Sequence, residues 1–118
     1  DIYLAALREV SEETDNGVIV DIEDLNEVAS INFLYPHQPD WDNHVHVFLV
    51  ERWDGNPLES EEMRPEWFDI SNIPFRKMWP DDILWLPRVL EGERLSAEFS
   101  FDKMDELVES KFSEYTLH

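Results

Sequence analysis

Cysteine is absent from this chain of 118 residues, glycine occurs only three times, and no long apolar run is present. Without cysteine the chain has no disulfide framework and no thiolate metal site. No run approaches the roughly 20 apolar residues of a transmembrane helix, and no secretory signal is visible. We therefore expect a cytoplasmic protein without a membrane partner.

Positive charge is also scarce, because 9 Lys and Arg stand against 28 Asp and Glu, giving a net charge of −19. Such a surface repels nucleic-acid polymers, whose binding depends on cations that neutralise phosphates. A small polyanion can still bind where metal ions screen the acids. The hydrophobic fraction of 42% and the aromatic fraction of 13% are typical of a packed globular protein.

Changes in hydrophobic periodicity predict two helices and several strands. Ile2 to Thr14 has helical spacing, and Asp15-Asn16-Gly17 supplies a stop. A second helix is expected over Pro80 to Leu90, where Pro87 should kink or shorten it. Residues 1–118 are interpreted as one mixed α/β domain with a connection at 36–43, a turn at 54–57, and strands at 18–22, 27–35, 44–53, 66–70, 95–101 and 107–115.

Three glutamates lie on one stripe of the first predicted helix. A helix turns by about 100° per residue, so Glu9 and Glu13 nearly eclipse each other, with Glu12 about 60° to one side. Like charges at this spacing cost stability, and carboxylates are the hard ligands that Mg²⁺ prefers. An acid-rich solvated helix face explains the same spacing, and from spacing alone that interpretation comes first.

The string Arg8-Glu9-Val10-Ser11-Glu12-Glu13 resembles the second half of the Nudix box, G-x5-E-x7-R-E-U-x-E-E-x-G-U, in which U is aliphatic. Residues 1–7 fill the x7 spacer, so the first Glu of the box would precede Asp1. Asp15 stands where the box has Gly, and Gly17 suggests a local rearrangement of that turn. We therefore expect an N-terminal segment to be missing from this sequence.

Further along, a segment resembles the 8-oxo-dGTP diphosphatase branch of the Nudix family, which is MutT-like. It runs from His46-Val47-Phe48 through Asn56 to Pro65, continues into Trp67-Phe68 and then covers Ile73 to Asp82. The resemblance runs from residue 1 to about Phe101, and Met78 to Asp82 is its most diagnostic part. It implies Mg²⁺-dependent hydrolysis of oxidised purine nucleoside triphosphates to monophosphate and pyrophosphate, with Mn²⁺ as an alternative ion. This activity sanitises the nucleotide pool and prevents DNA damage.

The resemblance also implies roles for the acids, residue by residue. Glu9, Glu12 and Glu13 would hold Mg²⁺, with one of them orienting or deprotonating the attacking water. Glu62 would match a further acid at the metal site that lies outside the box. Arg8 would pair with the missing box Glu, so its partner here is unknown.

The same resemblance implies a base pocket formed by Trp79, Asp81 and Asp82, with Met63 and Phe33 as apolar walls. Trp79 can stack on a purine. Two adjacent acids disfavour joint ionisation in a poorly hydrated pocket, so one can keep a proton and donate to a carbonyl oxygen. Without the resemblance, Pro80-Asp81-Asp82 would be interpreted simply as a helix start.

Other candidate ligands are interpreted as structural. His44 and His46 share one face of a predicted strand, and without a third ligand nearby we take them as packing or surface residues. Core or rim positions are expected for the remaining tryptophans, which are Trp41, Trp53, Trp67 and Trp85.

The implied fold is α/β, the Nudix α/β/α sandwich around a mixed sheet, lacking its N-terminal strands. Missing strands would expose sheet edges, so the chain alone is expected to be inactive. Two alternatives stay open: a Nudix hydrolase acting on another nucleotide, such as a methylated or unmodified purine triphosphate, and a non-catalytic nucleotide-binding or regulatory domain. The oligomeric state is left open.

Overall fold

The computed structural model describes residues 1–61 and 63–115, which form two compact units. The first unit comprises Asp1–Glu27 and Phe48–Phe68, and the second comprises Val28–Val47 and the described residues from Asp69 onward. Among the described residues, no helix has the length and apolar character needed to cross a membrane.

The first unit begins with α1 (Ile2–Glu13), which confirms the first predicted helix. The carboxylate of Asp1 caps it by accepting a hydrogen bond from the Tyr3 backbone N–H at 2.8 Å. The helix stops where Asp15 and Asn16 adopt left-handed backbone conformations, with φ of 51° and 60°. These two residues, rather than Gly17, provide the left-handed stop.

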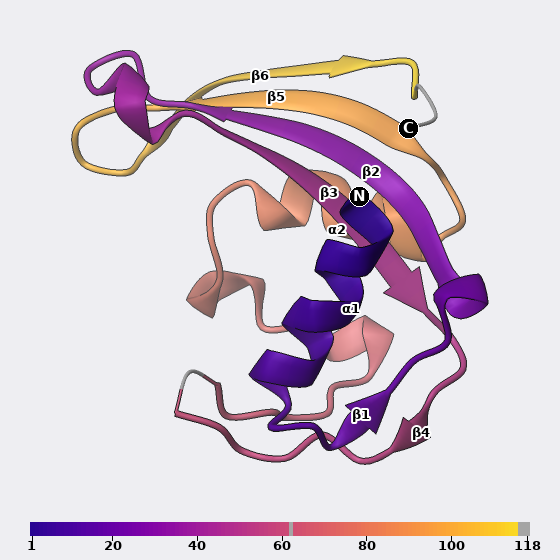
Figure 1. Cartoon of the computed structure of the whole chain (residues 1–118). Helices are drawn as coiled ribbons and strands as arrows, with labels where there is room; N and C mark the ends of the chain where they lie inside the picture. Colours follow the sequence, from indigo (N-terminus) through magenta and orange to yellow (C-terminus); the bar gives the residue numbers. More distant parts are fainter. Residues whose placement is uncertain (62, 116–118) are drawn as a thin grey trace. The chain divides into compact units, whose positions relative to one another are not determined.

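A short antiparallel ribbon follows α1 in the first unit (Figure 1). It pairs β1 (Val18–Ile19) with β4 (Asp54–Gly55), so the predicted turn at 54–57 is wrong at its first two positions. Gly17 is required by space, because a Cβ there would lie 2.3 Å from the backbone oxygen of Asn56. The sequence pattern indicated that the chain reverses near residues 54–57, but it did not indicate that residues 54–55 pair with β1.

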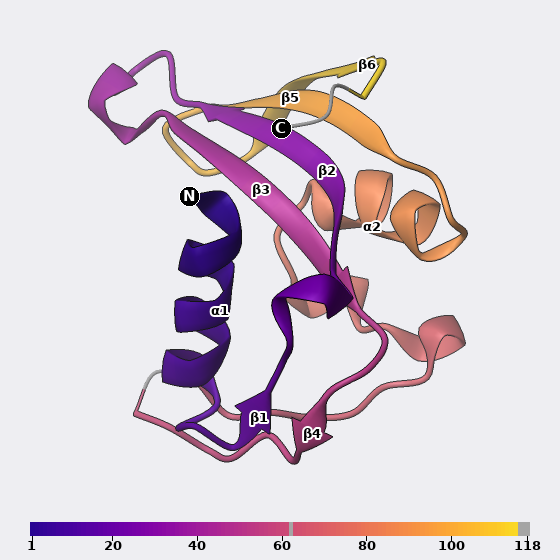
Figure 2. The same ribbon diagram turned by 45° about the vertical axis from the view of Figure 1, so that its right-hand side comes forward.

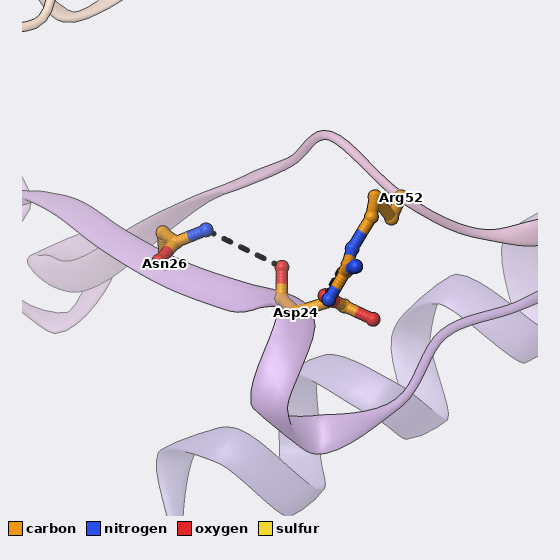
Figure 3. A network of polar contacts seen from close by, with 3 residues as sticks. All are labelled: Asp24, Asn26 and Arg52. Carbon is orange, nitrogen blue, oxygen red and sulfur yellow. Dashed lines mark hydrogen bonds and ion pairs between the residues drawn. The ribbon is translucent and has the colours of Figure 1, made fainter.

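A polar contact fastens the segment after β1 (Figure 3). The Arg52 guanidinium donates two hydrogen bonds to the Asp24 carboxylate, at 3.1 and 2.9 Å, and the Asn26 side-chain amide donates to the Asp24 backbone oxygen at 3.5 Å. Asp24 ends the 3₁₀ helix Ile22–Asp24. This contact joins the two chain segments of the first unit, Asp1–Glu27 and Phe48–Phe68.

A four-stranded mixed sheet with the order β3-β2-β5-β6 is the main element of the second unit. Its strands are β2 (Leu25–Leu34), β3 (Asn43–Val50), β5 (Leu95–Phe101) and β6 (Leu107–Ser113). Strand β5 runs parallel to β2 and antiparallel to β6. The predicted α/β class and mixed sheet are confirmed, and the strand predicted at 95–101 is found with the same bounds.

Helix α2 (Asp82–Leu90) lies along one face of this sheet in both views (Figures 1 and 2). Val89 of α2 is buried, as are Ile31 of β2 and Phe99 of β5. Arg88 anchors the helix to β6, since its guanidinium lies 4.6 Å from the centre of the Phe112 ring. The helix begins two residues later than predicted and continues through Pro87 to Leu90.

The strand predicted at 66–70 is wrong. The segment pairs with no described strand, and Ile70–Asn72 forms a 3₁₀ helix instead. Its apolar side chains are exposed, with 70% of Trp67 accessible. A strand needs a neighbouring strand to pair with its backbone groups, and the residues of one segment cannot show whether such a neighbour exists.

The two strand histidines pack as the sequence interpretation expects. The rings of His44 and His46 stack with centres 4.6 Å apart. The His44 ring nitrogen Nε2 lies 2.6 Å from the hydroxyl of Ser30 on the neighbouring strand β2. Within the described residues, no group of three or more His or acidic side chains is arranged to hold a metal ion.

Candidate functional site

The acids of the first unit lie along the exposed side of α1. The Arg8 guanidinium lies 3.9 Å from the carboxylates of both Glu9 and Glu12. All three side chains are more than half exposed, so these ion pairs contribute little to stability. Arg8 thus finds its partners within its own helix, and the carboxylates remain accessible to solvent.

The segment after β4 is fastened to the C-terminal end of α1. The Ser60 hydroxyl donates to the Glu13 backbone oxygen at 3.0 Å, and the Leu58 N–H donates to the Thr14 backbone oxygen at 3.2 Å. An open hollow of about 760 Å³ results, lined by Glu12, Asp15, Glu59, Ser60 and Glu61. Four carboxylates from two chain segments therefore share one hollow.

Carboxylate oxygens are the ligands that Mg²⁺ selects, so the type of donor in this hollow suits a hard divalent cation. Within the described residues, however, no three of these acids are already arranged to hold one. Among the described residues that line it, Glu12 is the one predicted ligand. Glu9 and Glu13 lie on the same helix, one turn or less away. Glu62 follows Glu61 in the chain and lies outside the described residues.

A pocket of about 300 Å³ opens in the second unit. Three sheet strands (β2, β3 and β5), the β2–β3 connection and the start of α2 contribute to it, and it has an aromatic wall and an acidic end. Its lining residues are Phe33, Tyr35, Trp41, Asn43, Val45, Trp79, Asp81, Asp82 and Phe101.

The acidic end of the pocket holds two adjacent carboxyl groups in different environments. Asp81 is 2% exposed, and its carboxylate accepts a hydrogen bond from the Trp85 indole N–H at 2.9 Å. Burial, together with the neighbouring charge of Asp81, raises the pKa of Asp82 from 3.8 to about 6. Asp81 thus accepts the hydrogen bond of the Trp85 indole, and Asp82 keeps its proton to a higher pH than an ordinary aspartic acid does.

Aromatic rings form the wall of the pocket around Phe101. The ring of Phe101 stacks with Phe33 at 6.2 Å and with Tyr35 at 5.6 Å, and it meets Trp79 edge-to-face at 6.4 Å. Trp79 remains 58% exposed. The pocket therefore offers an aromatic surface at Trp79 and polar groups at the two acids, which suits a planar ring that carries polar groups on one edge.

The structure brings together four of the five predicted base-pocket residues, which are Phe33, Trp79, Asp81 and Asp82. Met63, predicted as a wall, belongs to the first unit, as do the predicted metal ligands of α1. Sequence analysis missed the lining residues Tyr35, Trp41, Asn43, Val45 and Phe101.

Strand alternation could have found part of this missing set. Residues two apart share a face of a strand, so Phe33 of β2 predicts that Tyr35, the first residue after the strand, lies on the same side. Phe101 could have been inferred only from the pairing of β2 with β5, which no local pattern contains.

The fold agrees with the comparisons between this chain and known proteins. The model of the NUDIX domain family matches residues 1–89. The chain therefore belongs to the NUDIX family, whose members generally use divalent metal ions.

Two curated relatives are similar to most of the chain. It is 43% identical over 113 residues to the oxidized purine nucleoside triphosphate hydrolase of Danio rerio, which covers 96% of this chain and 69% of the relative. It is 39% identical over 103 residues to the mouse (Mus musculus) protein of the same name, covering 87% of this chain and 63% of that relative. The chain thus spans about two thirds of the length of these relatives.

Proposed function

We propose that this protein is a Mg²⁺-dependent diphosphatase that hydrolyses oxidised purine nucleoside triphosphates, such as 8-oxo-dGTP, to the monophosphate and pyrophosphate. The observation that carries the proposal is the pocket that an exposed tryptophan, Trp79, shares with two adjacent carboxyl groups, Asp81 and Asp82, of which Asp82 has its pKa raised to about 6. Both curated relatives carry names that specify oxidised purine nucleoside triphosphates.

Base recognition follows from the chemistry of this pocket. Trp79 provides a stacking surface, which is worth on the order of 1–3 kcal/mol per base. The Asp81 carboxyl group can accept a hydrogen bond from an N–H group of the base, and Asp82, whose raised pKa favours its neutral form, can donate one to a carbonyl oxygen. Oxidation at C8 turns an acceptor nitrogen into an N–H group and adds a carbonyl, so an edge with both groups suits this pair.

The first unit contains acids with the chemistry to hold a divalent cation. We assign Glu9, Glu12, Glu13 and Glu62 as the ligands of Mg²⁺, with Mn²⁺ as an alternative. When bound, the ion neutralises negative charge that develops on the phosphates and makes the attacking water more acidic. One of the helix glutamates orients that water or accepts its proton.

The nucleophile is water, so no side chain becomes covalently linked to the nucleotide. The attacking oxygen forms a bond to phosphorus while the bond from phosphorus to the bridging oxygen breaks, and pyrophosphate leaves. By consuming oxidised triphosphates, this reaction would sanitise the nucleotide pool and prevent DNA damage. The cytoplasmic location of the protein stays a prediction.

Substitution of Glu13 by Gln tests the catalytic part of the proposal in the intact gene product. Glu13→Gln keeps the size of the side chain but removes its charge, so pyrophosphate release should fall by about 100-fold or more, within the range that general acid–base catalysis contributes. Nucleotide binding should be retained. Glu106→Gln, an exposed change in the β5–β6 connection, is the matched control and should leave turnover unchanged.

Three results would contradict parts of the proposal. An unchanged rate in Glu13→Gln would remove its catalytic role. Turnover that does not depend on Mg²⁺ or Mn²⁺ would remove the metal assignment. Binding of purine nucleotides without any turnover would favour a non-catalytic nucleotide-binding domain.

A further inference from the structure

The connection between β2 and β3 forms one side of the pocket of the second unit. It is held by its own hydrogen bonds: the Tyr35 backbone N–H donates to the Asp42 carboxylate at 2.7 Å, and the Trp41 N–H donates to the Gln38 backbone oxygen at 2.9 Å. Pro39–Trp41 forms a 3₁₀ helix. Trp41 is therefore presented by an ordered turn.

Two tryptophans from distant parts of the sequence line this pocket, Trp41 from the connection and Trp79 before α2. Trp41 meets Tyr35 edge-to-face at 6.0 Å, and Tyr35 stacks on Phe101, which contacts Trp79. Four rings thus follow one another along the pocket, with a tryptophan at each end. Trp41 remains 57% exposed although it also packs against His37.

Asn43 begins β3 and lines the same pocket. Its side-chain amide makes no hydrogen bond to any described residue. An amide carries both a donor and an acceptor, whereas Asp81 and Asp82 offer a donor only when protonated. Asn43 can therefore complement either a carbonyl or an N–H group on a ligand edge.

We infer that Trp41 and Asn43 form a second base-recognition wall, on which Trp41 stacks against the purine that Trp79 holds and Asn43 hydrogen bonds to the polar edge of that purine. This inference rests on the proposed function, because it takes the pocket to be the base site. It makes the β2–β3 connection a determinant of substrate choice, independent of the metal-binding acids.

Calorimetric binding of 8-oxo-dGMP, a probe without the triphosphate chain, tests this wall directly. Trp41→Ala should weaken binding by about 5- to 150-fold, the loss expected for one base–aromatic stack. Trp41→Phe keeps an aromatic face and should recover most of the affinity, whereas Trp41→Leu should not. Asn43→Leu should weaken binding by about 2- to 12-fold, as for one neutral hydrogen bond.

Two further variants separate this inference from the proposed function. Trp67→Ala removes an exposed tryptophan of the first unit that does not line the pocket, and it should bind like the wild type. Trp79→Ala should weaken binding. Loss of affinity in Trp79→Ala with unchanged affinity in Trp41→Ala and Asn43→Leu overturns the second wall alone. A wild-type protein that binds neither 8-oxo-dGMP nor dGMP overturns both proposals.

Discussion

In the proposed function, the protonation of a single carboxyl group, that of Asp82, sets the pH range in which the pocket binds the purine. Its pKa is raised to about 6 by burial and by the charge of Asp81, so the folded protein binds this proton more tightly than the unfolded chain does. The resulting stability is fully present below pH about 4 and is lost as the pH rises through about 6. Base binding that uses the neutral acid should follow the same titration.

Asp82→Asn tests this pH dependence. The affinity of the wild type for 8-oxo-dGMP should fall as the pH rises above about 6, by up to about tenfold per pH unit. Asn is neutral at every pH and still donates a hydrogen bond, so the affinity of the variant should be flat from pH 5 to pH 8, to within about twofold. Parallel pH profiles for the two proteins, measured by calorimetry, would show that Asp82 does not donate to the base.

For single residues, the sequence predicted which side chains line the pocket better than it predicted the contacts that hold those side chains. The resemblance led to Trp79, Asp81 and Asp82 as pocket residues, and the structure brings them together. It could not reveal that the Trp85 indole holds Asp81, because that contact depends on the path of the chain into α2. Trp85 had been expected only at the core or rim.

At the scale of elements, the close approach of Gly17 to the β4 segment positions the end of α1. A Cβ on residue 17 would lie 2.8 Å from the Leu58 side chain and 2.9 Å from the Thr14 backbone oxygen. The φ of Gly17 is not in the left-handed region, so the constraint there is space alone. The same contacts hold the segment that lines the acidic hollow.

Gly17→Ala should therefore destabilise the protein by about 1–3 kcal/mol, as overpacking does, and should raise the Mg²⁺ concentration needed for turnover. Gly92→Ala is the comparison, because a Cβ there meets nothing within 4 Å although φ is +103°. That change should cost backbone strain of about 1–2 kcal/mol without altering the Mg²⁺ requirement. Urea unfolding and metal titration measure both effects, and equal Mg²⁺ requirements would argue against a positioning role for Gly17.

Helices and strands with a clear hydrophobic periodicity were predicted well, whereas the pairing of one strand with another was not. Helix α1 and strand β5 follow from the periodicity of their own residues. The β1–β4 ribbon has only two residues in each strand, too few for alternation to be recognised. The opposite error occurred at 66–70, where the predicted strand has no strand to pair with among the described residues.

For the molecule as a whole, the net charge of −19 opposes compaction through self-repulsion. Raising the NaCl concentration from about 0.01 to about 0.5 M shortens the Debye length from roughly 30 Å to a few ångströms, so the Tm should rise. A triple variant of exposed acids, Glu23→Lys, Glu91→Lys and Glu114→Lys, lowers the net charge to −19 + 6 = −13 and should respond less to salt. A Tm that is insensitive to salt in both proteins would show that self-repulsion is negligible.

The selectivity of turnover tests the central claim most directly. Steady-state pyrophosphate release by the intact gene product should give a kcat/KM for 8-oxo-dGTP at least about tenfold above that for dGTP, the ratio produced by roughly 1.4 kcal/mol of differential binding. Equal kcat/KM values for the two triphosphates would contradict recognition of the oxidised base and would favour a NUDIX hydrolase acting on another nucleotide.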